Sequence, residues 1–250
     1  EGFGGIDGVI KGKTELYADL AKRNGKVFVN GENETLIKKL QQFCFSNESY
    51  FEYGTKGRDC CKGKIVLGKE FLRVETTDGT IQTNLVGEFN FENGMSAVWV
   101  GRYFDINYGQ IKAAIEKYVP SNNRSQKISL ASNTIILDAY NANPSSMMEA
   151  LKNFEKIDAD NKIVILGEMM ELGEYSRVEH EKIKSQVDKM RVSKKMFVGN
   201  GFHFLADDKS ILWFGNTEEL KIWFKQQYFE NYYILIKGSR KNELEKILKE

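Results

Sequence analysis

The feature that most constrains the fold is an apolar run that ends in a polar turn and continues as a helix. Residues 133–138 are short, apolar and β-branched, which is typical of a buried parallel strand. Asp138 ends this run, Asn141 and Asn143 follow it, and Pro144 stands where a first helical residue tolerates proline. This order predicts polar side chains at the carboxyl edge of an open α/β sheet, where ligands bind. A simple turn capped by asparagine and serine fits the same residues, so both interpretations stay open.

Short apolar runs of the same kind recur through the second half of the chain and alternate with helical patterns. Strands are predicted at residues 134–138, 162–167, 195–199, 211–215 and 232–237, and helices at about 145–156, 176–190, 217–228 and 240–249. Alternating strands and helices predict an α/β fold, a Rossmann-like, doubly wound parallel sheet.

The first half of the chain has a different organisation. The patterns predict helices at 6–23 and 35–44, a strand at 26–30, a helix that follows residue 85 and runs to about 104, and a helix at 108–118. Between residues 49 and 86, strand patterns are separated by Gly, Asp-Gly and Lys-Gly, so we expect a small antiparallel patch. The polar stretch 121–126 separates the halves, and we place one domain over residues 1–125 and another over 126–250.

Composition narrows the class of protein. Lys and Arg total 36 against 35 for Asp and Glu, so no overall field favours nucleic acid or an anionic membrane. No apolar run approaches ~20 residues, so no membrane span is expected. Cys44, Cys60 and Cys61 fit no metal spacing and leave an odd thiol, which favours a reducing cytoplasm. The chain opens on Glu1 without a signal peptide, and we expect a fragment of a longer protein that lacks its amino-terminal part.

One apparent phosphate-binding motif is rejected. Gly12, Lys13 and Thr14 look like the end of a P-loop, but the first glycine of that motif would fall at Asp7. A P-loop also needs an apolar strand that feeds a glycine-rich turn, whereas Lys13 lies within a helical pattern.

Several segments together resemble the Mur ligases of peptidoglycan synthesis. The D-A-Y-N-A-N-P, L-G-E-M-M-E-L-G and K-G-S-R segments are specific as a series, and weaker matches extend the resemblance over nearly the whole chain. In chain order the segments are residues 1–4, 11–17, 87–93, 123–125, 138–144, 166–173 with His180, and 236–240. The resemblance implies the carboxyl-terminal part of a central ATP-binding domain, without its P-loop, followed by a complete carboxyl-terminal domain that binds the acceptor.

The branch of the family that the segments resemble implies an ATP-dependent ligase that adds D-alanyl-D-alanine to UDP-N-acetylmuramoyl-tripeptide. A substrate carboxylate takes the γ-phosphoryl group of ATP, and the amine attacks the acyl phosphate, with Mg²⁺ and cationic side chains spreading the charge. We expect a cytoplasmic monomer that binds neither nucleic acid nor a membrane, and a fragment that is inactive alone and binds ATP poorly. A sister ligase for another amino acid or for folate, and a non-catalytic α/β module that binds a dinucleotide or a protein, remain alternatives.

The resemblance also assigns residues in the first half. Lys13 matches a lysine that is carbamylated and helps to hold Mg²⁺, since a carbamate supplies the oxygen ligands that a hard metal prefers. An ordinary exposed helical lysine is the alternative. Asn90 and Asn93 match adenine contacts, although Phe89 stands where the family often has histidine. A helix N-cap at Asn90 is the other interpretation.

Contacts to the nucleotide or the acceptor are also assigned at the domain junction and after the strand that ends at Asp138. Arg124 matches an arginine that reaches the ATP phosphates, for which a guanidinium fork is suited. Asp138 matches a contact to the ribose or the nucleotide. Asn141 and Asn143 carry amides that suit a base edge or a substrate carboxylate, and Asn143 is expected to line the acceptor pocket.

The end of the last strand is assigned to the acceptor. Lys237, Ser239 and Arg240 open the last predicted helix, and by the resemblance they receive the carboxylate of the incoming amino acid. Ser239 is also suited to a plain N-cap.

The segment around residue 168 contains further ionisable side chains. Glu168 and Glu171 could form an acid–base pair, but a structural or amine-orienting role is preferred because acyl-phosphate chemistry needs no such pair. His180 lies on a polar helix, so we expect a solvated histidine, with proximity to substrate as the alternative.

Overall fold

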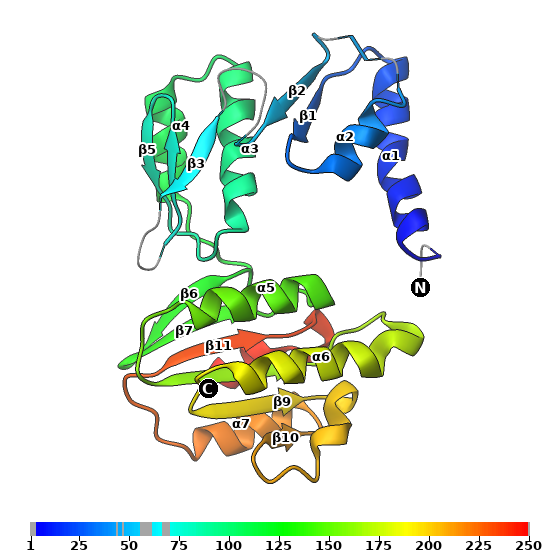
Figure 1. The fold of residues 1–250 in the computed structure, drawn as a ribbon. Helices are drawn as coiled ribbons and strands as arrows, with labels where there is room; N and C mark the ends of the chain where they lie inside the picture. Colours follow the sequence, from blue (N-terminus) through cyan, green and yellow to red (C-terminus); the bar gives the residue numbers. More distant parts are fainter. Residues whose placement is uncertain (1–3, 44, 47, 56–61, 67–70, 250) are drawn as a thin grey trace. The chain divides into compact units, whose positions relative to one another are not determined.

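The computed structural model describes residues 4–43, 45–46, 48–55, 62–66 and 71–249, so the three cysteines lie outside the described residues. The chain divides into two compact units, each treated separately below (Figure 1). The first comprises Glu1–Asn84 with Glu88–Tyr118, and the second comprises Leu85–Gly87 with Val119–Glu250. The polar stretch 121–126 therefore falls within the second unit.

The second unit is built on a six-stranded sheet with the strand order β10-β9-β8-β11-β7-β6. Its strands are β6 (Gln126–Leu130), β7 (Asn133–Asp138), β8 (Lys162–Gly167), β9 (Lys194–Val198), β10 (Leu212–Phe214) and β11 (Tyr233–Lys237). All pairings are parallel except that of β6 with β7, so the predicted α/β fold with a Rossmann-like sheet is confirmed. The antiparallel edge strand β6 was not predicted. It returns directly into β7 through a tight turn in which Ala131 has a φ of 50°.

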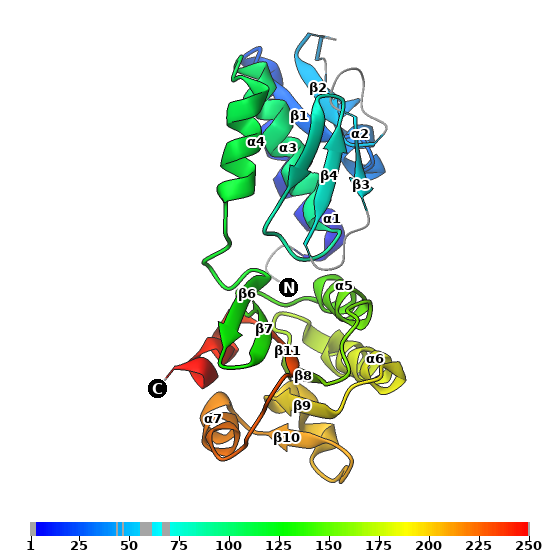
Figure 2. The same ribbon diagram turned by 90° about the vertical axis from the view of Figure 1, so that its left-hand side faces the viewer.

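Helices cover both faces of this sheet, as Figure 2 shows. On one face lie α5 (Pro144–Glu155) and α6 (Ser176–Lys189); on the other lie α7 (Thr217–Lys225) and the short turns η3 (Arg240–Asn242) and η4 (Leu244–Leu248). Two further 3-10 turns are η1 (Gly173–Tyr175) and η2 (Asn200–Leu205). The helix predicted at 240–249 is wrong, because Glu243 has a left-handed φ of 50° that separates η3 from η4.

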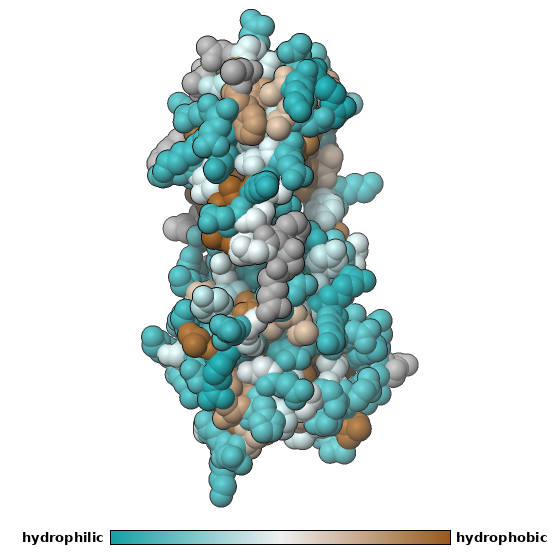
Figure 3. Space-filling model, turned by 90° about the vertical axis from the view of Figure 1, so that its right-hand side faces the viewer, coloured by the Kyte–Doolittle hydropathy of each residue, from teal (hydrophilic) through white to brown (hydrophobic). Residues whose placement is uncertain are grey.

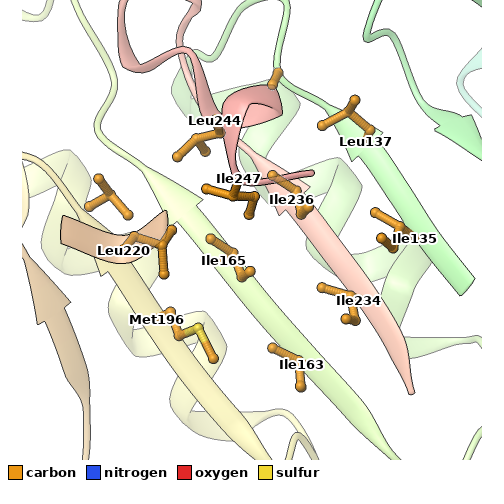
Figure 4. Close-up of a cluster of buried hydrophobic side chains, with 12 residues drawn as sticks. Ile135, Leu137, Ile163, Ile165, Met196, Leu220, Ile234, Ile236, Leu244 and Ile247 are labelled. Atoms are coloured by element: carbon orange, nitrogen blue, oxygen red, sulfur yellow. The ribbon is translucent and has the colours of Figure 1, made fainter. Parts of the chain in front are cut away.

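The core between the sheet and α7 with η4 is made of aliphatic side chains that alternate along the strands (Figure 4). The twelve buried members are Ile135, Leu137, Ala139, Ile163, Ile165, Met196, Val198, Leu220, Ile234, Ile236, Leu244 and Ile247. The central strands are buried on their other face as well, where Met147, Leu151 and Phe154 of α5 pack. This packing fixes the strand register, which sets Lys237 beside both Asp138 and Leu166 at the carboxyl edge.

The first unit contains two small sheets. In one, β1 (Val27–Asn30) pairs in parallel with β2 (Tyr50–Tyr53), next to α1 (Ile6–Lys22) and α2 (Glu34–Leu40). In the other, β3 (Gly63–Val66), β4 (Arg73–Thr76) and β5 (Gly79–Gln82) form the predicted antiparallel patch, accompanied by α3 (Asn90–Tyr103) and α4 (Tyr108–Lys117).

The region 49–86 was predicted to form the antiparallel patch, but its first strand, β2, pairs with β1 instead. Phe51 of β2 is in register with Phe28 of β1, and their rings stack at 5.4 Å. Tyr103 of α3 packs against both rings, each at 5.0 Å. The aromatic side chains therefore hold this strand beside β1, a long-range contact that the hairpin signals around it do not reveal.

The surface is mixed in character. On the face shown in Figure 3, hydrophilic residues predominate and the hydrophobic ones form small separate groups. None of the helices in the described part of the chain is long and apolar enough to cross a membrane.

Candidate functional site

The carboxyl ends of β7 and β11 bring two predicted site residues together. Lys237 Nζ donates to Asp138 Oδ2 at 2.5 Å and approaches the Asn141 carbonyl at 3.4 Å. The other carboxylate oxygen, Asp138 Oδ1, accepts from the Ser125 amide at 3.2 Å. The two side chains are only 2% and 15% exposed for Lys237 and Asp138, respectively. A charge pair buried in this way is costly to break, because either partner left alone would be desolvated without compensation. The pair therefore ties both strand ends to the segment before β6.

Arg124 lies in that segment, on the ring of Tyr140. Its Cζ is 4.0 Å from the ring centroid, and Arg240 Cζ is 5.3 Å from the same centroid. Both arginines are exposed. Both arginines were predicted from the sequence to be site residues, whereas Tyr140 was not, although it lies between Asp138 and Asn141. Its position two residues beyond a strand-ending carboxylate was the available signal.

The asparagines after β7 shape the turn into α5. Asn143 Oδ1 accepts from the Ser146 amide at 2.9 Å, and Ser146 Oγ accepts from the Asn143 amide at 3.1 Å, which together form a capping box. Asn141 Oδ1 accepts from the Ala142 amide at 2.9 Å. Both asparagines are exposed. The capped turn inferred from the residue types is therefore present, and it leaves both side chains at the sheet edge.

Ser239 joins the end of β11 to the end of β8. Its Oγ donates to the Glu168 carbonyl at 2.7 Å and also contacts Asn242, and the side chain makes no N-cap hydrogen bond. The neighbouring backbones approach closely, since a Cβ at Gly238 would lie 3.0 Å from the Gly167 Cα. Ser239 therefore occupies the N-cap position of η3 without a capping hydrogen bond from its side chain, and this buried hydroxyl holds two strand ends together.

His180 is buried, so the prediction of a solvated histidine is wrong. Its Nε2 accepts from the Met169 amide at 2.9 Å, and its Nδ1 donates to the Ser176 carbonyl at 2.7 Å. Burial lowers the pKa of the His180 imidazole, and the hydrogen bond that Nε2 accepts from the Met169 amide requires this nitrogen to be unprotonated. The charged residues around His180 on α6 hid the sequence pattern that indicates its burial. His180 shares a helix face with Ile183 and Val187, both buried, at the spacing of an apolar stripe.

Glu168 anchors the turn after β9. Its Oε2 accepts from the Gly201 amide at 2.8 Å, and its own amide donates to the Val198 carbonyl at 2.9 Å. Space around it is tight, since a Cβ at Gly201 would come within 2.6 Å of His180 Nε2. These contacts give Glu168 the structural role that was preferred over acid–base chemistry, whereas Glu171 lies exposed with a φ of 63°.

Three predicted site residues lie in the first unit. Asn90 is the first residue of α3 and is buried, and Asn93 Nδ2 donates to Asn90 Oδ1 at 3.0 Å. The N-cap position of α3 belongs to Phe89, so the capping interpretation of Asn90 does not hold. Lys13 is exposed on α1, within a continuous helix, as the rejection of a P-loop requires.

The described residues contain no ready-made cluster of metal ligands. Among them, no group of three or more His, Cys, Asp or Glu side chains could hold a metal ion.

The second unit matches a known family. The family model of the Mur ligase, glutamate ligase domain matches residues 123–240. The UDP-N-acetylmuramoyl-tripeptide–D-alanyl-D-alanine ligase of Buchnera aphidicola is 28% identical to this chain over 267 residues, covering 100% of the chain and 56% of that protein. The ligase of the same name from Escherichia coli is 26% identical over 263 residues, with 100% and 56% covered. The chain thus spans about half the length of the curated relatives it matches.

Solved structures show the same fold. The crystal structure of MurF from Acinetobacter baumannii matches with a TM-score of 0.76 at 22% identity, covering 98% of this chain and 55% of that one. MurF ligase from Thermotoga maritima, solved in complex with ADP, matches with a TM-score of 0.71 at 16% identity, covering 90% and 52%.

Proposed function

We propose that the chain, whose residues 123–240 match the Mur ligase, glutamate ligase domain, works as an ATP-dependent amide ligase of peptidoglycan precursor synthesis. The reaction would add D-alanyl-D-alanine to UDP-N-acetylmuramoyl-tripeptide in the cytoplasm. The observation that carries the proposal is the carboxyl edge of the second unit, where the Asp138–Lys237 pair lies among exposed amides and two exposed guanidinium groups.

The proposed reaction has two steps. An oxygen of the tripeptide carboxylate attacks the γ-phosphorus of ATP, the bond to the β-phosphate oxygen breaks, and ADP leaves. The amine of D-alanyl-D-alanine then attacks the carbonyl carbon of the acyl phosphate, phosphate leaves, and the nitrogen loses a proton. Negative charge builds up on the transferring phosphoryl group, so cationic side chains held at the site lower the barrier.

We assign the nucleotide side of this edge to Arg124 and Asp138. Arg124 is exposed and can present its fork to the phosphates. Asp138 Oδ2 is bound by Lys237 and its Oδ1 by the Ser125 amide, so ribose hydroxyls would have to share these oxygens, each of which has two lone pairs.

We assign the acceptor side to Arg240, Asn141 and Asn143. All three are exposed at the ends of β7 and β11, and Arg240 can pair with the dipeptide carboxylate. Lys237 and Ser239 are buried and bonded to neighbouring strand ends. Their proposed contribution to acceptor binding is therefore to hold the strand ends that carry the exposed groups.

In the first unit, which we assign to the central ATP-binding domain, Asn90 and Asn93 would face adenine. The hydrogen bond between their side chains orients both amides, and an amide can pair bidentately with the adenine edge.

When bound, Mg²⁺ would supply Lewis-acid stabilisation of the phosphates. Lys13 is the only site residue proposed for the ion. The predicted result is that Lys13→Ala nearly abolishes turnover in the complete gene product and that added formate or acetate partly restores it; normal turnover would remove the carbamate assignment.

The test of the function is an ADP-release assay on the complete gene product that carries this sequence. Release should require UDP-N-acetylmuramoyl-tripeptide and D-alanyl-D-alanine together. Single amino acids and folate with glutamate serve as matched alternatives, because they are acceptors or substrates of sister ligases. Equal or greater ADP release with one of these alternatives would replace the proposed acceptor. If neither the proposed pair nor any alternative caused ADP release, the ligase proposal would be contradicted.

A further inference from the structure

One aromatic ring lies against guanidinium groups from two distant segments. Arg124 precedes β6, whereas Arg240 follows β11, and both lie over the ring of Tyr140 with Cζ-to-centroid distances of 4.0 and 5.3 Å. The face of an aromatic ring attracts a cation within about 6 Å through its quadrupole. Tyr140 is therefore the common support of both guanidinium groups.

The backbone around Arg124 is held in an unusual conformation. Asn123 and Ser125, the residues on either side, have left-handed φ values of 58° and 47°. The Tyr140 amide donates to the Asn123 carbonyl at 3.2 Å, and the Ser125 amide donates to Asp138 at 3.2 Å. A non-glycine residue adopts such a φ at a cost in free energy and keeps it only where its surroundings fix it. These contacts are what fix Arg124 above the ring.

The backbone that leads into Arg240 is also held in place. Arg240 follows Ser239, whose hydroxyl donates to the Glu168 carbonyl, and Gly238, where an added Cβ would lie 3.0 Å from the Gly167 Cα. The starting point of its side chain is therefore set by the ends of β8 and β11. From this fixed point the long Arg240 side chain extends to the ring of Tyr140, and the residue remains exposed.

The charges at this edge do not balance. Lys237 forms an ion pair with the carboxylate of Asp138. Within the described ranges, neither Arg124 nor Arg240 is paired with a carboxylate. Two like charges brought to one ring repel each other unless anions bind nearby. Guanidinium groups present planar, bidentate donors that match phosphate and carboxylate groups. The arrangement is therefore suited to anionic ligands.

We propose that Tyr140 is a positioning residue whose ring holds Arg124 and Arg240 ready for two anionic groups, a phosphate of the nucleotide and the carboxylate of the acceptor. The assignment of the two anions rests on the proposed function. No hydrogen bond to the Tyr140 hydroxyl occurs among the described residues, so the ring and not the hydroxyl performs this role.

The first test compares Tyr140→Leu with Tyr140→Phe in the complete gene product. Loss of the ring in Tyr140→Leu should raise the KM for ATP and the KM for the dipeptide, each by about fivefold, with a smaller change in kcat. Tyr140→Phe should keep both KM values because the ring remains. Tyr228→Leu is the matched control, since Tyr228 is 83% exposed and precedes the amino end of β11.

Three results would overturn the proposal in an active enzyme. The KM values could stay unchanged in Tyr140→Leu, only one of them could rise, or Tyr140→Phe could match Tyr140→Leu. Melting temperatures are measured alongside, since a purely structural role would lower them without raising both KM values.

A second test needs no turnover and uses this chain. The Nε–H resonances of Arg124 and Arg240 are followed by NMR during titration with inorganic phosphate. In the wild type and Tyr140→Phe, the ring should shift the Arg124 resonance, and phosphate should move both signals together. In Tyr140→Leu, the ring-induced shift and the joint response should be lost. Unchanged signals in Tyr140→Leu would overturn the proposed role of Tyr140, whatever the ADP-release assay showed. A wild-type gene product that released no ADP would count against the ligase function instead.

Discussion

Two pairs of charged side chains at the same sheet edge differ in their exposure to solvent. Asp138 and Lys237 are buried against each other, whereas Arg124 and Arg240 stay exposed on the ring of Tyr140. The first pair satisfies its own charges and joins strand ends. The second pair leaves its charges for something else. The comparison separates side chains that build the edge from side chains that can bind a ligand there.

The largest expected effect is on stability. Lys237→Met leaves the Asp138 carboxylate buried without its partner and should lower the free energy of unfolding by about 3 kcal/mol. Combining it with Asp138→Asn should recover part of this loss, because no charge then remains buried. Urea unfolding monitored by circular dichroism provides the measurement.

The matched control for this variant is Lys182→Met. Lys182 pairs with Glu179 on α6 at 2.7 Å but is 59% exposed, so its removal should cost no more than about 1 kcal/mol. Similar losses for Lys182→Met and Lys237→Met would break the comparison, since burial would then make no difference.

The next effect is on binding. Arg124→Ala should raise the KM for ATP about tenfold and Arg240→Ala the KM for the dipeptide by a similar factor, while unfolding free energies change by less than about 1 kcal/mol. The reason is that each guanidinium group is exposed and supports no strand end. Steady-state kinetics of the complete gene product would measure this. If either variant lost stability as Lys237→Met is expected to, the arginine concerned would belong to the scaffold.

The smallest effect concerns a buried neutral group, His180. Burial lowers its folded-state pKa below the unfolded value of about 6.5, so its contribution to stability is fully present above pH 6.5 and is lost as the pH falls towards the folded-state pKa. The free energy of unfolding should therefore decline between pH 7 and pH 5.5. His180→Gln should flatten this slope, and His203→Gln, at an exposed position, should retain it. If the pH dependence of the unfolding free energy disappeared in His203→Gln, it could not be attributed to His180.

Local patterns predicted much of the second unit. The β-branched run at 133–138 and the Pro144 start of α5 were both interpreted correctly, because strand burial and helix initiation depend on neighbouring residues. The Asn143–Ser146 capping box was within reach of the same reasoning. The edge strand β6 was missed because most of its residues are polar, so it lacks the apolar run by which the other strands were predicted.

Contacts between distant segments could not be predicted. His180 is buried against Phe202, 4.5 Å between ring centroids, and no pattern within α6 names that partner. Tyr140 owes its role to an arginine before β6 and another after β11. The resemblance to a known family supplied Arg124, Asp138 and Lys237 as site residues. That Lys237 binds Asp138 follows only from the strand register.

The most direct test of this division of roles is a crystal structure of the complete gene product with ADP and D-alanyl-D-alanine bound. The predicted result is an intact Asp138–Lys237 pair, with a nucleotide phosphate on Arg124, the dipeptide carboxylate on Arg240, and both guanidinium groups still against Tyr140. A dipeptide carboxylate bound by Lys237, with the pair to Asp138 broken, would contradict it.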